Sequence, residues 1–276
     1  MKLLGFINLG NTCYLNSVLQ CFINDIDFQK IIKDNEDYLG LNEIISNVDF
    51  TNENEHISFN YNLNKFLKNF TGKQFPRFQQ HDAHEYILYF LDLIVKNYNF
   101  EKISPFTNLY HGQTKTTIKC CNCKNIKHVY EDFNTINLNV SENCKLEDIF
   151  IKYLKKEVHS DPDNLYFCDI CKKNCISEKK INLNKLPKKL ILVLKRYSSE
   201  CKSKFVIYPN TLCIREGSSL KRFELESVIN HFGNLYDGHY TANININDNW
   251  YFVDDNSITS GKFSCDINAY ILFYSV

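Results

Sequence analysis

Two stretches near the start of the chain carry apolar residues at the spacing of an amphipathic helix. The first is Tyr14–Phe22, and Thr12 stands before it as a candidate N-cap. The second is Gln79–Val95, where apolar residues such as Ile87 and Leu91 recur every three or four positions and form a core face. The pattern therefore predicts that the first part of the chain is mainly helical.

After about residue 104 the pattern changes to the alternation that is typical of strands. The predicted strands are Tyr110–Lys119, His128–Val140, Leu186–Tyr197, Phe223–His231, His239–Ile246, Trp250–Val253 and Tyr270–Tyr274, with a short helix at Lys145–Tyr153. No internal repeat or low-complexity linker divides the chain. The longest apolar run, Leu190–Leu194, is far shorter than the roughly 20 residues of a membrane span. We therefore expect one α+β domain and no membrane partner.

Composition narrows the functional classes. The 276 residues carry 32 basic and 32 acidic side chains, and this zero net charge does not favour a nucleic-acid partner. The chain has 12 cysteines, but nothing at its start resembles a secretory signal. These features favour a reducing compartment, the cytoplasm or the nucleus, where thiols are free, catalytic or bound to metal.

Cys13 stands at the start of the first predicted helix, directly after a Gly-Asn-Thr turn. The positive end of a helix dipole lowers the pKa of a thiol, and a nearby histidine completes its activation. His239 follows Gly238 at the start of a predicted strand, and Asp254 ends the next strand as a candidate orienting acid for the ring. These three residues predict a cysteine nucleophile with its base.

Asn8 lies five residues before Cys13 and supplies a side-chain amide. Acyl transfer develops an oxyanion that needs fixed donors, and this amide with the Cys13 backbone N–H offers two. Each residue alone has an ordinary interpretation. A cysteine at a helix start is usually a small buried residue, while Asn8, Asp254 and Asp255 are typical turn residues. The combination favours catalysis without identifying a substrate.

Two further groups of residues carry chemistry. Asp82 and Glu85, three positions apart, share one side of the first turn of a helix, where acidic residues are also favoured by the dipole alone. Two cysteine pairs with two intervening residues fit two corners each of a zinc tetrahedron. These pairs are Cys120 with Cys123 and Cys168 with Cys171. The long interval between the pairs leaves a redox dithiol as the alternative.

The chain resembles the ubiquitin-specific proteases over nearly its whole length. The segments that carry the resemblance are Gly5–Gln20, Gln80–Glu85, Leu186–Tyr197, Val228–Gly233, Gly238–Tyr240, Trp250–Asp255 and Ala269–Tyr274. The first matches the cysteine box of the family, and the segments between residues 228 and 255 match its histidine box. The resemblance implies a papain-like cysteine protease fold with a helical thumb, an antiparallel β palm and zinc-clamped β fingers.

The resemblance also implies roles for individual residues. Cys13 matches the nucleophile, His239 the general base and Asp254 the third member of the triad. Asn8 matches the oxyanion-hole amide, and Asp255 matches a neighbouring acid that helps to hold the site in some members. The thumb is expected at about 1–103, the fingers with part of the palm at about 104–185, and the rest of the palm at about 186–276.

The two cysteine pairs match those that clamp the fingers of the family around one structural zinc ion. Catalysis itself needs no cofactor. Cys121 and Cys175 are spare thiols near the pairs and are able to exchange with a ligand. Four thiolates around zinc leave no open position for a substrate.

The expected partner is ubiquitin, alone or attached to other proteins, and the chain is expected to act as a monomer. Asp82 and Glu85 suit the arginines of the ubiquitin tail, and His231 with Tyr240 match positions that line the narrow channel for its glycines. The resemblance therefore implies hydrolysis of the isopeptide or peptide bond after the last glycine of ubiquitin. Alternatives are a protease for a ubiquitin-like modifier, a non-catalytic ubiquitin-binding module and an unrelated papain-like protease.

Overall fold

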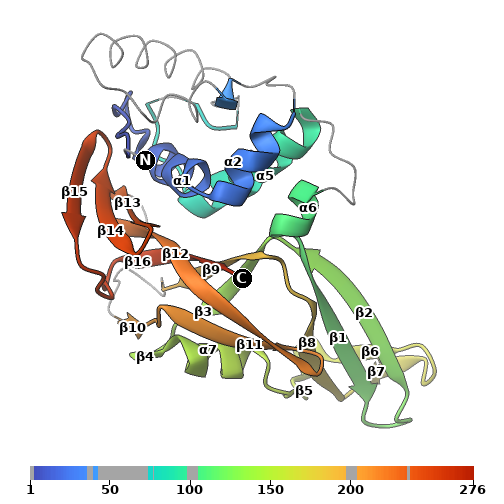
Figure 1. Cartoon of the computed structure of the whole chain (residues 1–276). Helices are drawn as coiled ribbons and strands as arrows, with labels where there is room; N and C mark the ends of the chain where they lie inside the picture. The colour runs from blue at the N-terminus through green and yellow to red at the C-terminus, as the bar shows by residue number, and fades with distance from the viewer. Residues whose placement is uncertain are drawn as a thin grey trace.

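Helices from the N-terminal part of the chain form a layer that packs on a large sheet (Figure 1). The structure is a computed structural model that describes residues 3–35, 40–42, 74–76, 78–97, 105–196, 204–234 and 237–276. The main helices of this layer are α1 (Cys13–Ile23), α2 (Ile26–Lys33), α5 (Ala83–Asn97) and the short α6 (Pro105–Tyr110). No helix among the described residues is long and apolar enough to cross a membrane.

The large sheet has the strand order β15-β14-β13-β12-β16-β9-β3, and β11 adds to the side of β12. Its strands are β3 (Thr135–Asn139), β9 (Lys189–Lys195), β11 (Thr211–Glu216), β12 (Ser219–Gly233), β13 (Gly238–Ile246), β14 (Asn249–Asp254), β15 (Ser257–Gly261) and β16 (Ala269–Ser275). All neighbours pair antiparallel except β3 and β9, which are parallel.

The central strands separate two hydrophobic cores. Ile191 and Val193 of β9 face the helical layer, whereas Leu190, Leu192 and Leu194 face a second core. This division follows from the alternation of side chains along a strand. The second core is closed by α7 (Leu146–Tyr153). Because both faces of β9 are covered, the run Leu190–Leu194 is apolar at every position.

A smaller sheet projects away from the helical layer (Figure 1). It has the order β2-β1-β8-β5, and a hairpin of β6 and β7 lies near its tip. Its elements are β1 (Gly112–Cys120), β2 (Ile126–Phe133), β5 (Glu157–His159), β6 (Tyr166–Cys168), β7 (Lys173–Cys175) and β8 (Ser177–Lys185). Three short elements complete the fold, namely β4 (Cys144–Lys145), β10 (Val206–Ile207) and the 3₁₀ turn η1 (Pro162–Asn164).

The α+β class and most of the predicted elements are confirmed, but three details were wrong. Thr12 makes no side-chain cap, because its hydroxyl accepts a hydrogen bond from the Leu9 N–H instead. Tyr110 ends a helix rather than beginning a strand. The single strand predicted at His128–Val140 is two strands, β2 and β3, that belong to different sheets. Tyr197, the predicted end of another strand, lies outside the described residues.

A buried lysine ties the helical layer to the large sheet. The Nζ of Lys189 on β9 lies 2.9 Å from Asp25, 3.2 Å from Asp27 and 3.0 Å from Glu226. Asp25 also caps α2 and accepts a hydrogen bond from the Tyr110 hydroxyl at 2.8 Å. Burial alone would lower the pKa of Lys189, but the carboxylates of Asp25 and Glu226 outweigh it, and its pKa is raised. The lysine is therefore charged and neutralises acids from both layers.

Lys189→Met is expected to lower the free energy of unfolding by about 3–5 kcal/mol, because it leaves the buried Asp25 carboxylate and the partly buried Glu226 carboxylate without their cation. In the variant these carboxyls would take up protons on folding, so its deficit should shrink as the pH falls from 8 to 5. Urea unfolding at both pH values measures this. The control Lys30→Met, at an exposed position of α2, should change the free energy by less than about 0.5 kcal/mol. A deficit that does not depend on pH would contradict the proposed charge balance.

Candidate active site

Cys13 is the first residue of α1, and the packing of that helix fixes its place. All eleven residues of α1 are buried, because the helix contacts α2 and α5 as well as β12, β13 and β14. The thiol of Cys13 lies beside the backbone N–H of Tyr240, the residue after His239. The fold therefore brings the two predicted catalytic segments, far apart in sequence, to one place.

The thiol of Cys13 does not have the lowered pKa that its position at a helix start predicted. Burial raises its pKa, the Asp255 carboxylate adds to this, and nearby backbone N–H groups oppose it only in part. The dipole is thus outweighed by desolvation. The resting thiol is protonated at neutral pH, so its activation requires a base.

His239 and Asp254 meet through the register of two strands. Ala242 of β13 pairs with Val253 of β14, so one step further Asp254 lies diagonally from His239 on the same face. The Nε2 of His239 is 2.6 Å from Oδ1 of Asp254, and both side chains are about two-fifths exposed. This contact leaves Nδ1 of the ring for the thiol. Among the described residues no hydrogen bond joins the thiol to the ring, as is common before substrate binds.

Asn8 is held by a network that the sequence did not reveal. Its Oδ1 accepts hydrogen bonds from the backbone N–H groups of Gly10 and Thr12, both at 3.1 Å. Its Nδ2 donates to Oδ2 of Asp255 at 3.0 Å, and Asn16 of α1 donates to the other oxygen of Asp255 at 2.8 Å. The amide is thus oriented with one N–H committed to Asp255. For Asn16 the sequence offered one signal, a polar residue within the apolar pattern of the first predicted helix.

The predicted acidic pair lies at the start of α5, but its two members differ. Oδ1 of Asp82 accepts hydrogen bonds from the N–H groups of His84 and Glu85, and Oδ2 accepts one from the Tyr270 hydroxyl at 2.7 Å. Asp82 therefore caps α5, and its charge lies at the helix start, where the dipole favours it. The Glu85 side chain is exposed and available to a ligand.

His84, in the first turn of α5, is not a surface residue. Its ring is buried between α5 and two strands, with Nε2 3.0 Å from Thr135 Oγ1 and Nδ1 3.3 Å from Lys195 Nζ. Because a lysine can only donate, the ring proton resides on Nε2. Burial and then the Lys195 charge lower the pKa of His84 to about 4. It is a neutral packing residue.

His231 and Tyr240 are cross-strand partners whose rings stack with centroids 4.4 Å apart. Both side chains are buried. Gly238 approaches this pair closely, since a Cβ at its position would lie 2.2 Å from His231 Nε2. The side chain of Gln80 hydrogen-bonds both the Asp237 carboxylate and the Gly238 N–H, at 2.7 and 3.0 Å. These contacts fix the turn that precedes His239.

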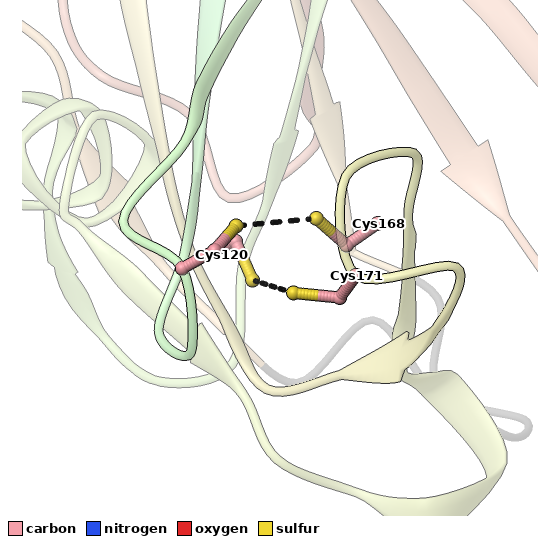
Figure 2. A group of neighbouring side chains, drawn as sticks. Cys120, Cys168 and Cys171 are labelled. Carbon is pink, nitrogen blue, oxygen red and sulfur yellow. Dashed lines mark hydrogen bonds between the residues drawn. The ribbon is translucent and has the colours of Figure 1, made fainter.

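The four cysteines of the predicted metal site come together at the tip of the small sheet (Figure 2). The sulfurs of Cys120 and Cys171 are 4.0 Å apart, those of Cys123 and Cys168 are 3.5 Å apart, and all four lie within 4.8 Å of one another. A zinc ion with Zn–S bonds of about 2.3 Å requires sulfurs roughly 3.8 Å apart. The arrangement fits zinc. The described cysteines are all free, so none forms a disulfide.

The two cysteine turns have the same backbone form. Lys124 and Lys172, which follow the second cysteine of each pair, both have positive φ, at 63° and 52°. The N–H of each lysine donates to the carbonyl of the first cysteine of its pair. Repetition of this turn presents both pairs of sulfurs in the same way, as a shared ion requires.

Comparison with known proteins agrees with this geometry. A family model described as ubiquitin carboxyl-terminal hydrolase matches residues 4–274. "Ubiquitin carboxyl-terminal hydrolase 17-like protein D" of Mus musculus is 27% identical over 302 residues, with 98% of this chain and 54% of the relative covered. "Ubiquitin carboxyl-terminal hydrolase 4" of Saccharomyces cerevisiae (strain YJM789) is 25% identical over 359 residues, with 98% of this chain covered. The chain spans only 39% of that relative's length.

A solved structure shares the fold. "Structure of the SAGA Ubp8/Sgf11/Sus1/Sgf73 DUB module bound to ubiquitin aldehyde" matches with a TM-score of 0.83 at 24% sequence identity. The match covers 99% of this chain and 69% of that one. The predicted helical, palm and finger architecture is therefore confirmed.

Gly238→Ala is expected to lower the free energy of unfolding by about 1–3 kcal/mol, because the new methyl group would displace the buried His231 ring or the Phe232 carbonyl. Chemical denaturation measures the change. Gly261→Ala in β15 is the matched control, since no atom lies within 4 Å of its Cβ position. Equal stability of the two variants would show that the close approach at Gly238 does not exist in solution.

Proposed function

Because this chain belongs to the ubiquitin carboxyl-terminal hydrolase family, we propose that it is a thiol-dependent deubiquitinating protease. Its reaction is hydrolysis of the isopeptide or peptide bond after the C-terminal glycine of ubiquitin. The observation that carries the proposal is the meeting of Cys13, the His239–Asp254 pair and the oriented Asn8 amide at one end of α1. A non-catalytic binding module has no need for this full set of residues.

The reaction begins with proton transfer from the Cys13 thiol to Nδ1 of His239. Asp254 holds the Nε2 proton and stabilises the charged ring. The thiolate attacks the glycine carbonyl, and the C–N bond breaks as the departing lysine amine takes the proton from Nδ1. Water then attacks the thioester with His239 again as base, which releases the ubiquitin carboxylate and restores the thiol.

The oxyanion of each tetrahedral intermediate receives two donors. One is the backbone N–H of Cys13, which belongs to the first turn of α1 and therefore has no partner within the helix. The other is the second N–H of Asn8. Asp255 holds the first N–H of that amide, and the backbone donors on Oδ1 prevent the amide from turning over. Asp255 and Asn16 act as positioning residues for this donor.

The substrate tail is proposed to pass between the start of α5 and the β12–β13 turn. Glu85 is exposed and Asp82 half-buried on that path, where their charges attract the arginines of the tail. The stacked pair of His231 and Tyr240 lies under the turn that precedes His239, where it limits the width of the channel. Such a channel selects glycine because it excludes larger side chains.

The remaining assignments follow from the same family. One structural Zn²⁺ is bound by Cys120, Cys123, Cys168 and Cys171, and as a closed site it takes no part in the reaction. The thumb is assigned to about 1–103, the fingers with part of the palm to about 104–185, and the rest of the palm to about 186–276. The first boundary falls outside the described residues. Ubiquitin and ubiquitinated proteins are the partners. The chain is proposed to act as a monomer in the cytoplasm or nucleus.

The first test is reaction with a ubiquitin probe that carries a C-terminal electrophile, followed by intact mass. The protein should gain one ubiquitin mass, and Cys13→Ala should gain none although Cys21→Ala still reacts. Since burial raises the pKa of the thiol, the rate of capture should increase with pH between 6 and 9. Reaction only with probes of ubiquitin-like modifiers would identify those modifiers as the substrate. No reaction with any probe would contradict the proposed activity.

Asn8→Ala is expected to lower kcat on a fluorogenic ubiquitin substrate by about 10²–10³-fold with little change in KM, because the lost amide donates mainly in the transition state. Steady-state kinetics separate the two constants. Asn35→Ala, at an exposed asparagine beyond α2, should keep both constants close to those of the wild type. A loss confined to KM would assign Asn8 to substrate binding instead.

A further inference from the structure

A fifth cysteine lies against the four-sulfur site. Cys175 ends β7, in the hairpin whose first strand ends at Cys168. The hairpin pairs Tyr166 with Cys175 and Cys168 with Lys173. Since alternate residues of a strand share a face, Cys175 is on the same face of the hairpin as the zinc ligand Cys168. The Cys175 side chain is 5% exposed, so its thiol is enclosed with the site.

The backbone also fixes Cys175 against the first cysteine pair. The N–H of Cys121 donates to the carbonyl of Ile176 at 2.9 Å, and Cys120 pairs with Ser177 where β1 meets β8. Cys175 therefore packs in one cluster with Cys120 and Cys168, and its thiol interacts with the sulfurs of Cys120 and Cys171. The thiol also donates a long hydrogen bond to the Lys173 carbonyl at 3.5 Å. The thiol is close to the site but weakly held elsewhere.

Tetrahedral zinc takes four thiolates, so five sulfurs exceed what one ion requires. Cys175 lies beside the Cys120–Cys171 edge, which at 4.0 Å is wider than the opposite Cys123–Cys168 edge at 3.5 Å. Cys171 is partly exposed, whereas Cys120 is fully buried. Figure 2 shows the Cys171 side chain pointing toward the facing cysteine turn. Solvent reaches two of the four ligands, Cys123 and Cys171, and of these two it is Cys171 whose sulfur interacts with the spare thiol of Cys175.

We propose that Cys175 is a reserve zinc ligand that takes the place of Cys171. In the exchange the bond from zinc to the Cys171 sulfur breaks and a bond to the Cys175 sulfur forms. The Cys175 proton passes to the departing thiolate or to solvent, so charge balances and no oxidant is involved. The ion then stays bound when Cys171 is alkylated or otherwise lost. The proposal is independent of the reaction at Cys13.

The test is the zinc content and zinc affinity of purified variants. Wild type and Cys175→Ala should each contain one zinc per chain. Cys171→Ala should keep close to one zinc, with a dissociation constant raised by about 10- to 100-fold. The double variant Cys171→Ala/Cys175→Ala should contain almost none. Equal zinc loss in Cys171→Ala and the double variant, or equal retention in both, would overturn the proposal.

Cys123→Ala is the matched control, because it removes a ligand from the edge opposite Cys175, and it should lose zinc. Cobalt substitution gives a second readout, since the sulfur-to-cobalt charge-transfer bands should keep the intensity of four thiolates in Cys171→Ala. Native mass spectra of briefly alkylated wild-type protein avoid any folding defect of the variants. Chains modified at Cys171 should keep zinc, and loss of the ion from every such chain would refute the exchange.

Discussion

The complete burial of α1 is the constraint on which the rest of the structure depends. A helix at a protein surface turns a polar side to water, but this one lies between other helices and the strands β12, β13 and β14. Its polar residues must therefore find partners inside the protein. Gln20 donates to the Leu4 carbonyl at 2.6 Å and Asn16 donates to Asp255 at 2.8 Å. These bonds tie the N-terminal segment and the β14–β15 turn to the helix, and so the oxyanion donor and the acid pair are placed relative to Cys13.

The same burial determines how the thiol is activated. A nucleophile at an exposed helix start would be a thiolate at rest, whereas desolvation holds the Cys13 thiol protonated. In the proposed reaction, activation of this thiol then depends on the His239–Asp254 pair. The partly exposed His239 is thus proposed to exchange protons, whereas the buried Cys13 is positioned by packing.

Local sequence signals predicted those parts of the fold and site that depend on short spacing. Apolar periodicity located α5, α7 and β9, and motif spacing brought together the four cysteines that the structure groups. Local patterns failed where contacts between segments far apart in the sequence determine the structure. His84 looks like a surface residue on its own helix, but β3 and β9 cover it. Likewise the bonds of Asn8 to Asp255 and of Gln80 to Asp237 join residues 247 and 157 positions apart, and no local pattern records them.

One strand joins the regions that a substrate would contact. β9 follows β8 after three residues, and β8 pairs with β1, whose last residue is Cys120 of the four-cysteine cluster. The first residue of β9, Lys189, binds the acids of α2 and the large sheet, and its last, Lys195, contacts His84 in the first turn of α5. That turn also carries the acidic pair proposed for the substrate tail. β9 therefore links the sheet that carries the four cysteines to the start of α5 through continuous backbone, and its two terminal lysines hold it against the helical layer.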